Sequence, residues 1–156
     1  MGVIIVGVDG SEPSAQAALA AARLASALGS ALRVICAFGR SEERTADGRG
    51  SEYGEWAFGG RTLDASGLSG ATRVAEGAIA RIRAFYPRLE VSAHAVSGRP
   101  AAALLQAAEQ FDAELIVVGN KNVQGASRIL GSVAKEVAKR ARCDLYVAHT
   151  TPRPGV

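Results

Sequence analysis

The chain has 156 residues, of which 48% are hydrophobic and 21% charged, and its formal net charge is +3. A chain of this length fits one domain that buries about 70% of its unfolded surface. The charge is too small, and too concentrated in tails and turns, to indicate a nucleic-acid-binding protein. The first apolar run stops at Asp9, which is too short for a signal or a membrane span. Cys36 and Cys143 have no partners at metal-ligand spacing, so we expect reduced thiols and a cytoplasmic protein. From the short apolar run we expect no membrane contacts.

The N-terminal part of the chain predicts a strand, a helix and a second strand. Residues 3–8 (VIIVGV) form the continuous apolar run that is typical of a strand covered on both faces. Ser11 can cap the helix that follows, and Pro13 is tolerated in its first turn. Helical propensity is strong over 15–28, a glycine ends that helix, and a second strand is predicted over 31–38.

Residues 39–67 then lose all periodicity and predict a long irregular insertion. The insertion contains the apolar island YGEWAF at 53–58, with the only tryptophan, Trp56. A loop of this length within a compact domain is either mobile or functional. Packing of Trp56 over a sheet edge is the favoured interpretation, and a lid over a site stays open as the alternative.

Helices and strands alternate again after the insertion. The predicted elements are helices over 70–86, 100–110 and 131–142 (the last beginning at Gly131 or Ser132) and strands over 90–96, 114–118 and 144–149. This alternation predicts one doubly wound α/β domain over 1–150, with a mainly parallel sheet and helices on both faces. The tail 151–156 contains two prolines and is expected to fray.

The loop after the first strand has a residue suited to ligand binding. In such folds ligands bind beyond the carboxyl ends of the strands, where the strand order reverses. The sequence GVDGS at 7–11 places Asp9 and Gly10 at that end of the first strand. Asp9 can accept a hydrogen bond from a ribose hydroxyl or hold Mg²⁺ against bound phosphates.

The crossover 119–132, after the fourth strand, has the second set of candidate residues. Gly119 lets the backbone turn sharply out of the sheet. Gly131 and Ser132 begin a helix whose unpaired N–H groups favour an anion. The spacing fits neither the Walker loop nor the GxGxxG fingerprint, so a plain connector between strand and helix remains open.

The chain offers little for catalysis. His94 and His149 lie on predicted strands, and neither can be paired with a nucleophile from the sequence. We therefore predict no catalytic residues.

Three stretches, in the same order, resemble the universal stress protein family. They are VGVDGS at 6–11, GRP at 98–100, and LIVVG at 115–119 followed by LGSV at 130–133. The resemblance covers nearly the whole chain except the insertion, and the closing CDLYVAHTT is similar to actinobacterial members that bind cyclic AMP. It implies a five-stranded sheet in the order 3-2-1-4-5, a homodimer and, in one branch of the family, binding of ATP, AMP or cyclic AMP.

Carried over position by position, the resemblance implies a nucleotide site built on both loops. Asp9 would contact the ribose or a Mg²⁺ ion, and Ala37, at the end of the second strand, would offer backbone contacts to adenine. Gly119, Asn120 and Asn122 would line the ribose and phosphate.

The phosphate itself would be held at the start of the last helix by Gly131, Ser132 and Val133. The family signature has a glycine where this chain has Asn122, and nine residues where this chain has eight before Gly131. Asparagine tolerates left-handed backbone angles better than other non-glycine residues.

The leading hypothesis is therefore a universal stress protein that binds an adenine nucleotide without fast turnover and acts as a regulatory or sensing module. Two alternatives stay open: a nucleotide-free dimeric interaction protein with an unknown protein partner, and a slow ATP hydrolase. The last strand, 144–149, carries Leu145, Tyr146 and Val147 and is expected to be an edge that pairs with a second copy of the chain.

Overall fold

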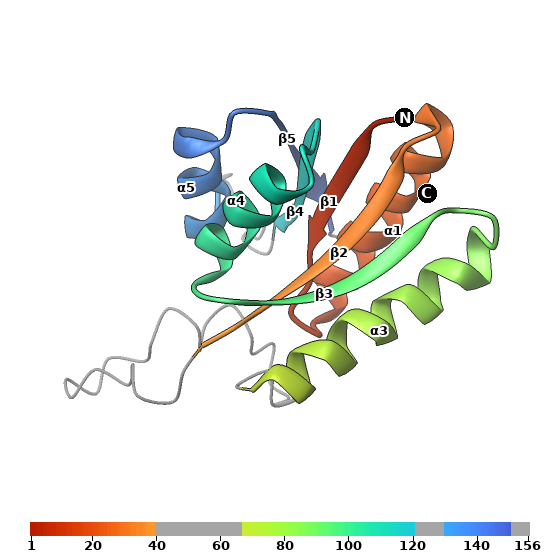
Figure 1. Cartoon of the computed structure of the whole chain (residues 1–156), viewed down its shortest axis with the longest axis horizontal. Helices are drawn as coiled ribbons and strands as arrows, with labels where there is room; N and C mark the ends of the chain where they lie inside the picture. Colours follow the sequence, from red (N-terminus) through yellow and green to blue (C-terminus); the bar gives the residue numbers. More distant parts are fainter. Residues whose placement is uncertain (40–66, 121–129, 151–156) are drawn as a thin grey trace, which may run out of the picture.

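The computed structural model describes residues 1–39, 67–120 and 130–150, and every structural statement below concerns these residues. Their strands pair in parallel in the order β3-β2-β1-β4-β5, which confirms the predicted topology (Figure 1). The strands are β1 (Val3–Gly7), β2 (Ala31–Phe38), β3 (Val91–Ser97), β4 (Leu115–Asn120) and β5 (Asp144–His149). The helices are α1 (Glu12–Leu28), α3 (Leu68–Phe85), α4 (Pro100–Gln110) and α5 (Ser132–Arg140).

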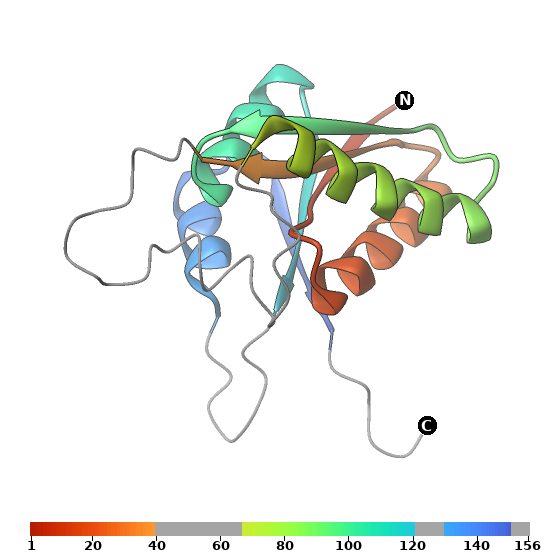
Figure 2. The ribbon, with the colours of Figure 1, turned by 90° about the horizontal axis from the view of Figure 1, so that it is seen from below.

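The helices cover the two faces of the sheet in pairs. Figures 1 and 2 show α1 and α3 on one face and α4 and α5 on the other. Side chains of a strand alternate between faces, so Ile4 and Val6 pack toward α1 whereas Ile5 packs toward α4 and α5. The sheet thus separates two apolar cores, as a doubly wound fold requires.

Helix α1 lies close to the sheet because its buried face consists of small residues. Ser11 is its N-cap and accepts from the backbone N–H of Ser14, as predicted, and Pro13 lies in its first turn. Gly29 ends the helix in the left-handed conformation, at φ 67°. The buried residues of α1 are Ser14, Ala17, Ala18, Ala21, Ala22 and Ala25.

Some predicted boundaries differ from those observed. Helix α1 begins at Glu12, directly after its cap, rather than at residue 15. Helix α5 ends at Arg140, two residues before the predicted end, because Ala141 adopts an extended conformation with ψ 141°. Apart from Gly39 and Gly67, the predicted insertion lies outside the described residues, and so does the tail 151–156.

The amino end of the sheet holds the start of the chain. Met1 is 88% exposed there, at the end of β1 opposite Asp9. In the described part of the chain no helix is both long and apolar enough to cross a membrane.

Candidate functional site

The carboxyl ends of the three central strands bring residues from three loops to one place. β1 pairs with β2 through Gly7 and Ile35, and with β4 through Val6 and Val117. Two residues beyond the Gly7–Ile35 pair, the same register places Asp9 level with Ala37. Three residues beyond the Val6–Val117 pair, it places Asp9 level with Asn120 on the other side. The strand order reverses at β1, because β2 and β3 are added on one side of it and β4 and β5 on the other, with α1 and α5 on opposite faces of the sheet. This is the switch point at which doubly wound folds bind ligands.

The side chain of Asp9 is 5% exposed and is held by the first turn of α1. Its Oδ1 accepts from the backbone N–H of Ser11 at 2.9 Å and from the Ser11 hydroxyl at 2.5 Å. The backbone N–H of Asp9 donates to Ser14 Oγ at 3.2 Å. Gly10 makes this tight turn possible, since its φ of 83° lies in the region that favours glycine.

Gly119 is confirmed at the end of the central strands, but its predicted role as a sharp exit from the sheet is wrong. β4 continues to Asn120, because Gly119 and Asn120 still pair with Ala148 and His149 of β5. A Cβ on Gly119 would lie 3.3 Å from the carbonyl oxygen of Pro13. The glycine therefore admits the start of α1, which is a packing requirement.

Asn120 is half-buried at the end of β4. Its carbonyl oxygen accepts from the Thr150 hydroxyl at 2.7 Å, which ties the chain after β5 to the end of β4. Ala37, also half-buried, pairs with Val96 of β3 and accepts from the Cys36 thiol at 3.8 Å. Asn122 lies outside the described residues.

The N-cap of α5 is a glycine, which has no side chain to cap the helix. Gly131 is the N-cap, with no side-chain hydrogen bond and no acidic residue in the first turn. Its backbone, at φ −62°, suits any residue, and among the described residues nothing lies within 4 Å of the position of a Cβ. Ser132 is exposed, whereas Val133 is buried in the same cluster as Val118 of β4. Burial of Val133 fixes the start of α5, and the first N–H groups of a helix have no partner within the helix. This helix start therefore suits an anion.

The residues present fit an adenine nucleotide. A buried carboxylate suits ribose hydroxyls, and a backbone edge at Ala37 suits a base. The first N–H groups of α5 suit phosphate, and no described atom lies within 4 Å of a Cβ position on Gly131. In the described ranges no group of three His, Cys, Asp or Glu residues could hold a metal ion alone. Mg²⁺ would therefore need oxygens of the nucleotide as further ligands, beside Asp9.

Sequence reasoning missed part of this site. Ser11 was predicted only as a helix cap, and Ser14 was not singled out, yet both bind Asp9. The available signal was the short spacing Asp-x-Ser, in which an aspartate accepts from the backbone two residues on.

A serine–histidine contact lies on β3, away from the candidate site. On β3, Ser92 Oγ and His94 Nε2 are 2.8 Å apart, and the imidazole packs on Phe111 at 4.7 Å between ring centroids. Burial, and next the charge of Arg33, lower the pKa of His94. A base in a catalytic triad needs a carboxylate that stabilises its protonated form, whereas a guanidinium opposes it.

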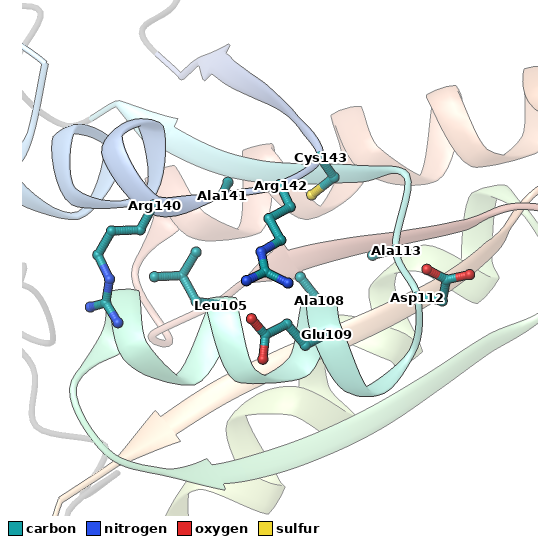
Figure 3. Close-up of a pocket in the computed structure, with 9 residues that line it drawn as sticks. All are labelled: Leu105, Ala108, Glu109, Asp112, Ala113, Arg140, Ala141, Arg142 and Cys143. Carbon is teal, nitrogen blue, oxygen red and sulfur yellow. The ribbon is translucent and has the colours of Figure 1, made fainter.

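A separate cavity of about 350 Å³ lies at the opposite, amino end of β4 and β5. Figure 3 shows the side chains of Arg142 and Glu109, two of its lining residues, extending toward each other. Burial raises the pKa of the Cys143 thiol in its wall, which disfavours a reactive thiolate. None of the predicted site residues lines this cavity, so it is distinct from the candidate site.

Topology and site together define a doubly wound α/β protein with ligand-binding features at its switch point. The model of the universal stress protein family matches residues 1–149. The chain therefore belongs to the universal stress protein family, as its motifs indicated.

Solved structures and curated relatives give the same family. A universal stress protein crystallised in complex with cAMP is 28% identical, with a TM-score of 0.70 over 96% of this chain and 98% of that one. A universal stress protein from Archaeoglobus fulgidus in complex with dAMP is 23% identical, with a TM-score of 0.66 over 94% of this chain and 97% of that one. Universal stress protein Rv1636 from Mycobacterium tuberculosis is 42% identical over 57 residues, which are 36% of this chain. That matched segment spans 39% of the relative's length.

Proposed function

We propose that this universal stress protein binds an adenine nucleotide (ATP, AMP or cyclic AMP) and serves as a stress-related regulatory or sensing module. The observation that carries the proposal is the buried Asp9 carboxylate at the switch point of a sheet whose last helix starts at a glycine N-cap. The cAMP complex of the 28% identical relative supports the same ligand class.

Each part of the proposed site has one task. Asp9 accepts from the ribose hydroxyls, and the backbone at Ala37 borders the adenine. Gly119, Asn120 and Asn122 line the ribose and phosphate. The phosphate is held at the start of α5 by Gly131, Ser132 and Val133. Mg²⁺, where present, is shared between Asp9 and the phosphate oxygens.

Ligand-dependent melting tests the proposal. A ligand that binds only the folded protein stabilises it by about 2.7 kcal/mol at a concentration of 100 Kd. We expect ATP, AMP or cyclic AMP to raise the melting temperature, with guanosine and cytidine nucleotides as controls. No shift with any adenine nucleotide, and no nucleotide released from freshly purified protein, would exclude the proposed function.

A nucleotide-free interaction protein is the second candidate. The observation that favours it is Asn122, which takes the place of a glycine in the family signature, in a loop one residue shorter. Slow ATP hydrolysis is a separate possibility at the same site, and phosphate release that disappears in Asp9→Ala would establish it.

We further propose a homodimer that forms through β5. β5 is the edge strand beside β4, and its Tyr146 is 38% exposed. An edge strand presents unpaired backbone groups that pair readily with another chain. The free cysteines Cys36 and Cys143 are compatible with a cytoplasmic location, which we also propose.

A further inference from the structure

Asp9 is joined to the first turn of α1 by several hydrogen bonds. The Ser11 hydroxyl donates to Asp9 Oδ1 and accepts from the backbone N–H of Ser14. The Ser14 hydroxyl donates to the carbonyl oxygen of Ser11 at 2.9 Å and accepts from the backbone N–H of Asp9. Both the main chain and the side chain of Asp9 are thereby fixed to α1.

The two bonds of the Ser11 hydroxyl have different roles. The bond from Ser14 N–H caps α1 at a long 3.3 Å, whereas the hydroxyl proton is donated to the Asp9 carboxylate. Hydrogen bonds to an ionised group are also about twice as strong as neutral ones. The hydroxyl therefore serves the carboxylate at least as much as it serves the helix.

Two donors on one oxygen determine how the carboxylate is turned. The terminal torsion of an aspartate has a broad energy profile, so its own stereochemistry leaves the carboxylate plane free to rotate. The Ser11 N–H and Ser11 hydroxyl approach Oδ1 from the same residue and define that plane. The directions of both carboxylate oxygens are then set from α1.

We propose that Ser11 is a positioning residue of the nucleotide site, which orients the Asp9 carboxylate toward the ribose hydroxyls and so favours ribonucleotides over sugars that lack them. The proposal rests on the proposed function. It predicts that Ser11 acts only through Asp9 and only on ligands that carry ribose hydroxyls.

Calorimetric titration with matched ligands tests it. Wild type, Ser11→Ala and Ser11→Thr are titrated with ATP and with 2′,3′-dideoxy-ATP; if cyclic AMP binds more tightly, they are titrated with cyclic AMP and 2′-deoxy cyclic AMP. We expect Ser11→Ala to lower affinity for the ribonucleotide about five- to tenfold and to leave that for the deoxy ligand within twofold. Ser11→Thr, which keeps the hydroxyl, restores ribonucleotide affinity.

A double-mutant cycle with Asp9→Asn separates positioning from a general effect on the fold. Added to Asp9→Asn, Ser11→Ala is expected to cause no further loss of ribonucleotide affinity. Loss of the helix cap lowers the melting temperature by about 2–4 °C, so titrations are made well below it.

The outcomes are distinct. A wild type that binds no nucleotide removes the proposed function and this inference together. A wild type that binds, with Ser11→Ala weakening both ligands equally or neither, removes the inference alone.

Discussion

Gly119 and Gly131 delimit the same crossover, yet the structure gives them opposite requirements. A Cβ at Gly119 would lie 3.3 Å from Pro13 O, 3.3 Å from Thr150 Cγ2 and 3.4 Å from Ala17 Cβ. At Gly131 a Cβ meets no described atom within 4 Å. The first glycine is needed for packing, whereas the described residues place no such requirement on the second.

For Gly119→Ala we expect a loss of about 1–2 kcal/mol in the free energy of unfolding, because the carbonyl of Pro13 is backbone and cannot swing away. Urea denaturation measures the change. Gly131→Ala is the matched control, with an expected change within about 0.5 kcal/mol. Equal losses in the two variants would show that the crossover, and not the approach of α1, sets the cost.

Gly131→Val should abolish adenine-nucleotide binding and leave the fold intact, because the added methyl groups occupy the space at the start of α5. Isothermal titration measures the affinity, and circular dichroism checks the fold. Gly67→Val is the control, since Gly67 is also an uncapped N-cap glycine with open space at its Cβ position. Unchanged affinity in Gly131→Val would place the phosphate elsewhere.

Contacts between residues close in the sequence could be predicted, whereas contacts between distant residues could not. The Ser11 cap and the position of Asp9 follow from residues a few positions apart, and the structure confirms both. The packing role of Gly119 depends on Pro13 and Thr150, which are distant in the chain, so spacing within the loop could not reveal it.

At the scale of elements, an ion pair joins α1 to α3. Arg81 donates from both terminal nitrogens to the Glu12 carboxylate, at 3.1 and 2.9 Å. These bonds, and a further one from Gln16, lower the pKa of Glu12 from its ordinary value of 4.5. Both side chains are largely exposed, so solvent screens the pair.

The stability that this pair contributes is predicted to vary with pH. Because the folded state lowers the pKa of Glu12, the contribution is complete above the unfolded value near 4.5 and is lost as the pH falls through the lower folded value. We expect Glu12→Gln to cost about 0.5 kcal/mol at pH 7 and less at pH 3, as measured by urea denaturation. In an Arg81→Ala background the same substitution should show a smaller pH dependence, because only the bond from Gln16 remains; an undiminished one would show that the ion pair is not its cause.

Element types were predictable because hydrophobic runs and alanine-rich segments of this length have one favoured structure. The ends of elements were less so. β4 runs to Asn120, two residues past the predicted end, because β5 supplies partners there, and a strand partner is a tertiary feature. The short α5 was predicted too long because Ala141 has high helix propensity but lies in the turn toward β5.

At the scale of the whole molecule, the proposed homodimer gives a direct measurement. Light scattering at micromolar concentration should give twice the mass of one chain. Tyr146→Arg, which places a charge on the exposed side chain of β5, is expected to yield monomers whose melting temperature no longer depends on protein concentration. A monomeric wild type would remove the dimer proposal and leave the nucleotide proposal untouched.

The strand order came from the family resemblance and the parallel sheet from the alternation of elements, and both are confirmed. The sequence did not reveal the hydrogen bonds between Asp9 and the start of α1. Nor did it place Asp9 beside Ala37 and Asn120, because adjacency across a sheet depends on strand register.

Because all five strands point the same way, the chain start and the candidate site occupy opposite poles, with Met1 88% exposed. A biotin or tag attached ahead of Met1 would therefore anchor the protein to a sensor chip with the Asp9 pole facing the flow. Binding kinetics could then be recorded on an oriented layer, without a linker obstructing the entry of small molecules.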